Sequence, residues 1–297
     1  MNIIVTGGLG FIGSEFVKYA SNQGAHCTVI DNMTYAADKS RLKGYNYDLI
    51  LKDICEDVSF ACQDAHYIVN FAAESHVDRS IKDGKPFLKS NIEGTFNMLE
   101  IARQIPTLKK FIQISTDEVY GEMDGCWDGE ADSSTLLDPS SYYSATKASA
   151  DLLVNSVART YGLNTLITRT CNNFGVSQNK EKFLPTIFNA INNDKEIPIY
   201  GDGTQVREWI WVNDNVRMIY DLMTKNHTGI YNIGSGDRWQ NREIIQLIGD
   251  ILGKKVKYKF VEDRLGHDKR YAIKSNIAPK FKLKTLEQYL KEQLWFQ

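Results

Sequence analysis

Several features that mark other classes of protein are missing from this sequence. Its five cysteines include no CxxC pair, and its five histidines show no HxxxH spacing. A disulfide framework and a zinc cluster are therefore disfavoured, and we predict no metal site. An odd number of thiols without a disulfide pattern fits a reducing compartment, so we expect a cytoplasmic protein. The cysteines are Cys27, Cys55, Cys62, Cys126 and Cys171.

Long apolar runs and an excess of charge of one sign are absent as well. No apolar run reaches the roughly 20 residues of a membrane span, and the N-terminal segment lacks the basic region of a signal peptide. Lys and Arg number 35 against 37 for Asp and Glu, which gives a formal net charge of −2. This balance favours neither a nucleic-acid partner nor a membrane partner, so any phosphate-bearing ligand has to be bound by local groups.

The first half of the chain alternates short apolar runs with longer amphipathic stretches. We predict strands over residues 3–6, 27–31, 48–53, 67–71, 111–115 and 165–170, with helices over 87–103 and 143–161. The strands are almost unbroken apolar runs, which is typical of parallel strands that are covered on both faces. The alternation therefore predicts an α/β fold with a Rossmann-like, doubly wound parallel sheet.

After about residue 171 this rhythm changes. Helical stretches at 183–192 and 242–252 are separated by short strand-like pieces at 197–200 and 255–261. We predict a Rossmann domain over residues 1–170, completed by segments near 205–235, and a smaller C-terminal α/β lobe over 171–297. The lobe should cover the edge of the sheet at which ligands bind.

A glycine-rich turn follows the first predicted strand. Gly7, Gly10 and Gly13 have GxxGxxG spacing and lead into a helix, so the backbone can approach a pyrophosphate at the helix N-terminus. The second strand ends in Asp31, where a ligand for a ribose 2′-hydroxyl belongs. Because an acid there repels a 2′-phosphate, we predict NAD rather than NADP. The alternative is an ordinary tight turn with a solvated Asp.

Two further motifs carry candidate chemistry. Tyr143 and Lys147 are four residues apart and share a helix face, so the lysine could lower the pKa of the phenol for proton transfer. Thr116, Asp117 and Glu118 end the fifth strand and should point toward the cofactor crevice. Repulsion between the two carboxyls would keep one of them protonated. A surface Tyr–Lys pair and a polar loop with solvated acids are the alternatives.

With these motifs in place, the chain resembles the extended short-chain dehydrogenase/reductases, and within them the nucleoside-diphosphate-glucose 4,6-dehydratases of the dTDP-glucose type. The Thr-Asp-Glu block and the block at 263–271 are the most specific features. The matching blocks are residues 6–13, 31–36, 53–55, 71–80, 115–121, 143–147, 172–175, 181–185, 200–203, 207–209 and 263–271. Departures from the family pattern lie after Tyr35, at 176–179 and at Asp214-Asn215, and they leave the nucleotide preference open.

The resemblance implies a reaction that oxidises and dehydrates a sugar. Tyr143 would deprotonate the 4-hydroxyl as hydride passes from C4 to NAD, while Thr116 hydrogen-bonds the 4-oxygen. Glu118 would then remove the C5 proton, and Asp117 would protonate the departing C6 hydroxyl. The hydride returns to C6 and gives a 4-keto-6-deoxy sugar.

The glycine turn and the resemblance together also imply the binding residues and a homodimer. The predicted NAD site comprises Gly7, Gly10, Phe11, Ile12, Gly13, Asp31, Asn32, Thr34, Asp53, Ile54, Ala72, Ala73, Ser75, Ser90, Tyr143, Lys147 and Asn173. The predicted nucleotide-sugar site comprises Ser75, Thr116, Asn172, Lys182, Phe183, Arg207, Asn241, Arg264 and His267. The alternative to these ligand roles is that each arginine forms a surface ion pair and that His267 is a core residue. Competing functions are a sugar-nucleotide epimerase or decarboxylase, and a non-catalytic NAD-binding protein.

Overall fold

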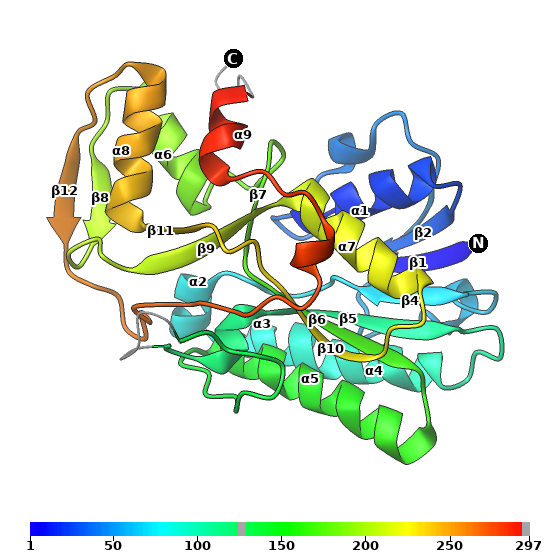
Figure 1. The fold of residues 1–297 in the computed structure, drawn as a ribbon. Helices are drawn as coiled ribbons and strands as arrows, with labels where there is room; N and C mark the ends of the chain where they lie inside the picture. Colours follow the sequence, from blue (N-terminus) through cyan, green and yellow to red (C-terminus); the bar gives the residue numbers. More distant parts are fainter. Residues whose placement is uncertain (124–128, 293–297) are drawn as a thin grey trace.

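Seven parallel strands form the central sheet of the protein, in the order β10-β6-β5-β4-β1-β2-β3 (Figure 1). The structure is a computed structural model, which describes residues 1–123 and 129–292, so Cys126 lies outside the described residues. The sheet confirms the predicted Rossmann-like α/β fold. Its strands are β1 (Asn2–Thr6), β2 (His26–Asp31), β3 (Asp48–Leu51), β4 (Tyr67–Asn70), β5 (Lys110–Thr116), β6 (Thr165–Thr170) and β10 (Gly229–Ile233).

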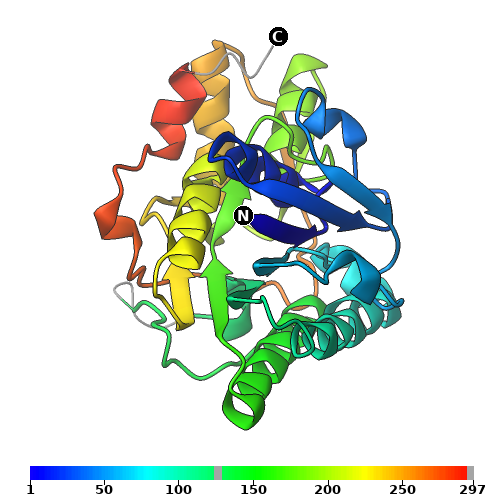
Figure 2. The same cartoon turned by 90° about the vertical axis from the view of Figure 1, so that its right-hand side faces the viewer.

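Helices cover both faces of this sheet, as the apolar strands predict (Figures 1 and 2). On one face α1 (Phe11–Asn22) packs beside α7 (Val212–Thr224), and on the other α4 (Gly94–Ala102) packs beside α5 (Tyr142–Tyr161). Because successive strand residues point to opposite faces, Ile3 and Val5 join Phe16 of α1 in one core cluster. Ile4 joins Met98 of α4 in the other.

The predicted helix over 87–103 is not a single α-helix. It consists of α3 (Lys85–Phe87), a π-helical segment (Leu88–Glu93) and α4, preceded by α2 (Val77–Lys82). The wide turn carries the buried Asn91, whose side-chain amide donates to Glu74 O at 3.0 Å and to Thr146 Oγ1 at 2.9 Å. Asn91 Oδ1 accepts from Glu74 N at 2.9 Å. Through Asn91, the π-helical segment thus links the segment after β4 to α5. Such wide turns are frequent at functional sites.

The remaining elements form a smaller lobe beyond the carboxyl ends of the strands (Figure 1). Phe174, Leu184, Trp209 and Ile244 lie in its separate core. The predicted helix 183–192 and strand 197–200 have the observed bounds, whereas the predicted strand 255–261 begins only at Tyr258. The lobe contains β7 (Asn172–Phe174), β8 (Ile197–Tyr200), β9 (Val206–Trp211), β11 (Arg238–Gln240), β12 (Tyr258–Val261), α6 (Phe183–Asn192), α8 (Asn241–Leu252) and α9 (Leu286–Glu292).

Short 3₁₀ turns connect some of these elements. The predicted division into two domains at residue 170 stays a prediction. Both β9 and β10 come from the segment near 205–235, but only β10 joins the large sheet. Among the described residues, no helix combines the length and apolarity that a membrane crossing requires. The 3₁₀ turns are Lys39–Leu42, Ser59–Ala61, Asp117–Tyr120 and Ala278–Lys280.

The contact between α1 and the glycine turn generates a stability prediction. A Cβ at Gly13 would lie 2.3 Å from Gly7 O, so Gly13→Ala should lower the free energy of unfolding by about 1–3 kcal/mol despite alanine's better helix propensity. Gly10→Ala is the matched control, because its Cβ would stay 3.1 Å from the same oxygen and φ is −70°. Urea denaturation of both variants measures the difference, and equal stabilities would contradict the prediction.

Candidate active site

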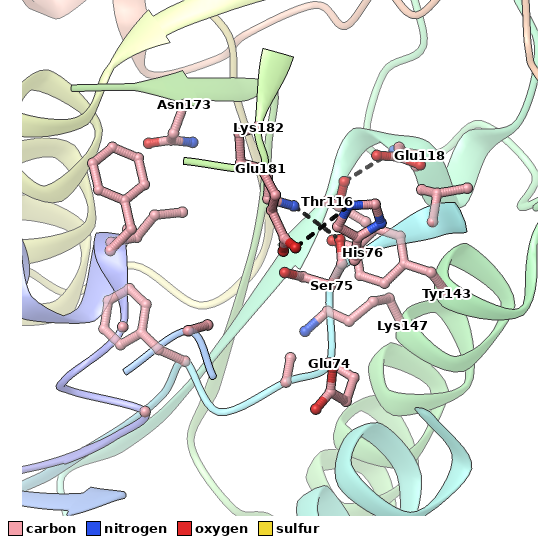
Figure 3. Close-up of a pocket in the computed structure, with 18 of the residues that line it drawn as sticks. Glu74, Ser75, His76, Thr116, Glu118, Tyr143, Lys147, Asn173, Glu181 and Lys182 are labelled. Carbon is pink, nitrogen blue, oxygen red and sulfur yellow. Dashed lines mark hydrogen bonds and ion pairs between the residues drawn. The ribbon is translucent and has the colours of Figure 1, made fainter. Parts of the chain in front are cut away.

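One large cavity opens at the carboxyl ends of the strands and extends under the lobe (Figure 3). Its volume is about 770 Å³. Of the sequence-predicted site residues, only Asp117 does not line it. Those that do are Gly7, Gly10, Phe11, Ile12, Gly13, Asp31, Asn32, Thr34, Asp53, Ile54, Ala72, Ala73, Ser75, Ser90, Thr116, Glu118, Tyr143, Lys147, Asn172, Asn173, Lys182, Phe183, Arg207, Asn241, Arg264 and His267.

The glycine turn makes one end of the cavity fit a dinucleotide. Gly7 has φ of +65°, and a Cβ there would lie 2.7 Å from Ala72 N, so only glycine suits this approach of β1 to the segment after β4. Gly10 is the residue before α1 and leaves the helix N-terminus open to the cavity. Unpaired N–H groups of a helix N-terminus bind pyrophosphate.

Asp31 lies at the end of β2, next to this turn. Its Oδ2 accepts from Leu9 N at 3.0 Å and its Oδ1 from Met33 N at 2.8 Å. Burial raises the pKa of Asp31, and these two backbone hydrogen bonds oppose that rise. Each carboxylate oxygen can accept more than one hydrogen bond, so the residue holds its loop and still has capacity for a ribose hydroxyl.

Tyr143 and Lys147 share the face of α5 that is turned toward the cavity (Figure 3). The helix begins with a capping box between Ser141 and Ser144, which fixes the register of both side chains. Lys147 is 4% exposed, and its Nζ donates to Ile114 O at 2.5 Å. Burial lowers the pKa of Lys147 to about 8.

The pKa of Tyr143 departs from the sequence prediction. The prediction was a lowered pKa beside the lysine, but burial raises it and the nearby Glu118 carboxyl raises it further. A hydrogen bond with Thr116 opposes the rise. The phenol is therefore protonated in the protein as it stands.

Thr116, Asp117 and Glu118 form the first turn after β5. The Thr116 hydroxyl accepts from Glu118 N at 3.3 Å and donates to Asp117 Oδ1 at 3.2 Å. Glu118 lines the cavity, whereas the Asp117 carboxyl is buried behind the wall and does not. The prediction that all three side chains point into the crevice is thus wrong for Asp117, whose buried carboxyl accepts a hydrogen bond from Thr116 and does not line the cavity.

Burial affects both acids of this turn. It raises the pKa of Asp117 well above its usual range, and the carboxyls of Glu118 and Glu208 add to the effect. It also raises the pKa of Glu118, but the charges of Arg207, Arg264 and Lys182 oppose that rise. The two neighbouring acids therefore have unequal environments, with Asp117 the more readily protonated.

Three cations gather at the lobe end of the cavity. Lys182 donates to Ser75 O at 3.3 Å, Arg264 pairs with Asp78 Oδ1 at 3.0 Å, and Arg207 donates to Asp268 O at 2.8 Å. Burial lowers the pKa of Lys182 and of Arg207. Because buried cations need counter-charge, this end suits an anionic ligand such as a diphosphate.

Other predicted residues are already engaged within the protein. His267 Nδ1 lies 2.6 Å from Asp263 Oδ1, so the histidine is fixed at the cavity wall. Asn173 Nδ2 donates to Thr170 Oγ1 at 3.1 Å and to Cys171 O at 3.0 Å. These bonds use both donors of Asn173, so any cofactor contact has to come from its oxygen or its backbone.

Both departures from the family pattern in the second half converge on Asn173. Gln178 Nε2 donates to Asn173 O at 2.9 Å, and Asn215 Nδ2 donates to Asn173 Oδ1 at 2.7 Å. Asn215 is fully buried. The unusual residues therefore hold a cavity residue in place and do not disturb the chemistry at the other wall.

Sequence reasoning missed a cluster at the rim of the cavity, which we call the rim clasp: Tyr35, Arg79 and Glu181. The Arg79 guanidinium lies 3.7 Å from the centre of the Tyr35 ring, and its Nη2 lies 3.0 Å from Glu181 Oε2. His76 Nε2 approaches the same oxygen at 3.9 Å. The matching blocks contain these residues, but their separation in the chain gave no signal that they meet.

Comparisons with known proteins agree with this geometry. A model of the NAD dependent epimerase/dehydratase family matches residues 3–234. The chain belongs to that family. It is an NAD-dependent enzyme, and among the family's members it resembles the hydro-lyases named dTDP-glucose 4,6-dehydratase.

The alignments with individual relatives extend over nearly the whole of this chain. The Low-salt glycan biosynthesis protein Agl12 of Haloferax volcanii is 46% identical, over 92% of this chain and 90% of that protein. The dTDP-glucose 4,6-dehydratase of Haemophilus influenzae is 39% identical, over 92% and 89%. The crystal structure of DesIV, a dTDP-glucose 4,6-dehydratase from Streptomyces venezuelae with NAD and TYD bound, has a TM-score of 0.93 at 34% identity and covers 100% and 97%.

The position of Asp31 generates a prediction for cofactor binding. Replacing it with alanine removes a charged acceptor and two loop contacts, so NAD affinity should fall about 10- to 100-fold. Asp38→Ala is the control, because that carboxylate caps the next turn outside the cavity. Calorimetric titration of NAD into cofactor-free protein compares them, and similar losses in both variants would count against Asp31 as a cofactor ligand.

Proposed function

We propose that this family member is a nucleoside-diphosphate-glucose 4,6-dehydratase that acts on dTDP-glucose. The observation that carries the proposal is the shared cavity wall of Thr116, Glu118 and Tyr143, with the glycine turn at one end and buried cations at the other. Such an arrangement suits a hexose held beside a nicotinamide with its diphosphate under the lobe. NAD, when bound, supplies the acceptor for a hydride from C4 and returns that hydride to C6.

The first step belongs to Tyr143 and Thr116. Tyr143 takes the proton of the 4-hydroxyl as the C4–H bond loses its hydride, and Thr116 hydrogen-bonds the 4-oxygen that becomes a ketone. The raised pKa of the Tyr143 phenol means that it needs positive charge to act as a base. We assign that role to the Lys147 ammonium on the same helix face.

Elimination belongs to the two acids. The 4-ketone acidifies the C5–H bond, and the Glu118 carboxylate removes that proton while the C6–O bond breaks. Asp117, the more readily protonated acid, supplies the proton with which the C6 hydroxyl leaves as water. The Asp117 carboxyl lies 3.2 Å from the Thr116 hydroxyl, which lines the cavity.

The nucleotide end follows from the cations. Lys182, Arg207 and Arg264 would bind the diphosphate, with Asn241 and His267 beside them. The names of relatives such as the Haemophilus influenzae enzyme support dTDP as the nucleotide. The name of the Agl12 relative specifies no substrate.

The decisive test is a product assay with dTDP-, UDP-, GDP- and CDP-glucose in deuterated water. A dehydratase gives a 4-keto product that has lost one water and gained deuterium at C5, most rapidly from dTDP-glucose. A 4-epimer without deuterium, or no change in any of the four sugars, would refute the proposed function.

Glu118→Gln should separate oxidation from elimination. Without the base, the rate of keto-product formation should fall about 10²- to 10⁴-fold, while substrate still reduces part of the bound NAD. Absorbance at the nicotinamide band and mass spectrometry of the sugar follow the two steps. Glu130→Gln, an acid paired with Arg238 outside the cavity, is the control and should turn over normally. Normal turnover of Glu118→Gln would refute the base assignment.

We also propose a cytoplasmic homodimer. The described cysteines are free thiols, which fits a reducing compartment. Leu88, Phe96 and Leu152 are 52%, 53% and 60% exposed beside a groove between the π-helical segment, α4 and α5. Apolar side chains clustered on two neighbouring helices suit packing against the same helices of a second copy.

Phe96→Glu tests the dimer. Burying a carboxylate in an apolar helix contact is costly, so the variant should elute as a monomer whose mass light scattering confirms, at concentrations where the parent is dimeric. Leu136→Glu alters an 87% exposed leucine outside this groove and should leave the oligomer unchanged. A parent protein that is monomeric would exclude the proposed contact.

A further inference from the structure

Helix α5 carries a third ionisable side chain in register with the two that face the cavity. Tyr143, Lys147 and Asp151 are spaced at four-residue intervals and so follow one face of the helix. Asp151 is fully buried and does not line the cavity, so it takes no direct part in the proposed reaction.

A rigid set of partners holds Asp151 from the side of the sheet. Arg169 of β6, 2% exposed, donates from Nε to Asp151 Oδ2 at 2.9 Å. The same guanidinium donates from Nη1 to the Tyr120 hydroxyl at 2.9 Å, and that hydroxyl donates to Asn232 Oδ1 at 2.7 Å. Burial raises the pKa of Asp151, while the charge and hydrogen bond of Arg169 oppose the rise. The carboxylate is thus fixed in position.

The second carboxylate oxygen of Asp151 has no such partner. Asp151 Oδ1 is buried without a hydrogen bond of normal length to any described residue. The Ser115 hydroxyl is near enough to lower the pKa of Asp151 but does not close such a bond. Ser115 follows Ile114, whose carbonyl receives the Lys147 ammonium at 2.5 Å. Lys147 and Asp151 thus contact consecutive residues of β5.

We propose that Asp151, fixed by Arg169, is a positioning residue that keeps Lys147 charged and seated on the Ile114 carbonyl. This inference rests on the proposed function for its consequence, since the ammonium would stabilise the Tyr143 phenolate. Only one of the three N–H groups of Lys147 is bound to Ile114, so two stay available to the cavity.

Among the charges near Lys147, that of Asp151 favours the protonated form of the lysine. Burial lowers the pKa of the lysine, and the Asp151 carboxylate is the charge that raises it. Across from α5, Glu118 and Asp117 raise the pKa of the Tyr143 phenol, and the charge of Asp151 also raises it. On the π-helical segment, Lys89 is engaged with Asp53 at 3.3 Å.

Charged residues farther from Lys147 do not supply the negative charge that Asp151 provides. On the π-helical segment, Glu93 faces the exposed groove between the helices, away from the cavity. On β6, the Arg169 guanidinium is already neutralised by Asp151. Without the carboxylate, Lys147 would keep its burial, and Arg169 would be left unpaired; burial and uncompensated positive charge both favour the neutral form of a lysine.

The test reads the protonation of Lys147 directly. Trace acetylation at a series of pH values, quantified by peptide mass spectrometry, gives the pH at which this amine becomes reactive in protein with matched NAD content. Asp151→Asn should move that midpoint down by about 1 pH unit or more, and Asp151→Glu should restore it. An unchanged midpoint in Asp151→Asn would overturn the proposal.

A second variant covers loss of folding. Asp151→Asn combined with Arg169→Met removes both charges of the buried pair and leaves no unpaired arginine. It still lacks the carboxylate, so the midpoint should again fall, and a parental midpoint in the folded double variant would refute the inference. Arg169→Lys keeps the charge and should keep the midpoint near that of the parent.

Activity then separates the two proposals. If the parent dehydrates a nucleotide sugar, the alkaline limb of bound-NAD reduction should move to lower pH in Asp151→Asn by the same amount as the midpoint. A shifted midpoint in a chain that dehydrates none of the sugars would refute the proposed function while sustaining the role of Asp151. If the protein dehydrates a nucleotide sugar but the midpoint of Asp151→Asn is unshifted, the proposed function is sustained and the role of Asp151 is refuted.

Discussion

The structure around the site depends on one constraint, which is that charges buried at the carboxyl ends of β5 and β6 must find partners. A buried ionised group without a partner is very costly, and removing water makes each remaining interaction stronger. Lys147 is satisfied by a strand carbonyl, and Arg169 by Asp151 and Tyr120. The cavity wall formed by β5 and α5 is therefore backed by charged side chains that are fixed by their partners. Such a wall is preorganised, which is the property that electrostatic catalysis requires.

Much of this arrangement could be predicted from local sequence patterns. The parallel sheet follows from unbroken apolar runs such as β6, because a strand buried on both faces has no polar alternation. The glycine turn follows from Gly7 and Gly13, where backbones approach so closely that a side chain has no room. The pairing of Tyr143 with Lys147 follows from helical spacing alone. Each of these inferences concerns neighbours within a few residues.

The parts that sequence could not supply depend on contacts between distant segments. The Asp117 carboxyl lies behind the wall near Arg207 and Glu208 of β9, a placement that spacing does not encode. The raised pKa of Tyr143 reflects burial and a neighbouring Glu118, neither visible in a YxxxK motif. The wide turn at Asn91 interrupts a good helical pattern because a side chain has to reach two other elements. In each case tertiary packing overrides a local preference.

The rim clasp has a consequence for how ligands could come and go. Arg79 is shared: the ring of Tyr35 holds it on the side of the segment after β2, and Glu181 holds it on the side of the lobe. Because an exposed ion pair is weak, an outward swing of the lobe could break the contact with Glu181 alone. The stacked Tyr35 ring would then still hold Arg79 on the side of the segment after β2. One arginine with two separable partners could therefore keep its contact on one side while the contact on the other side opens.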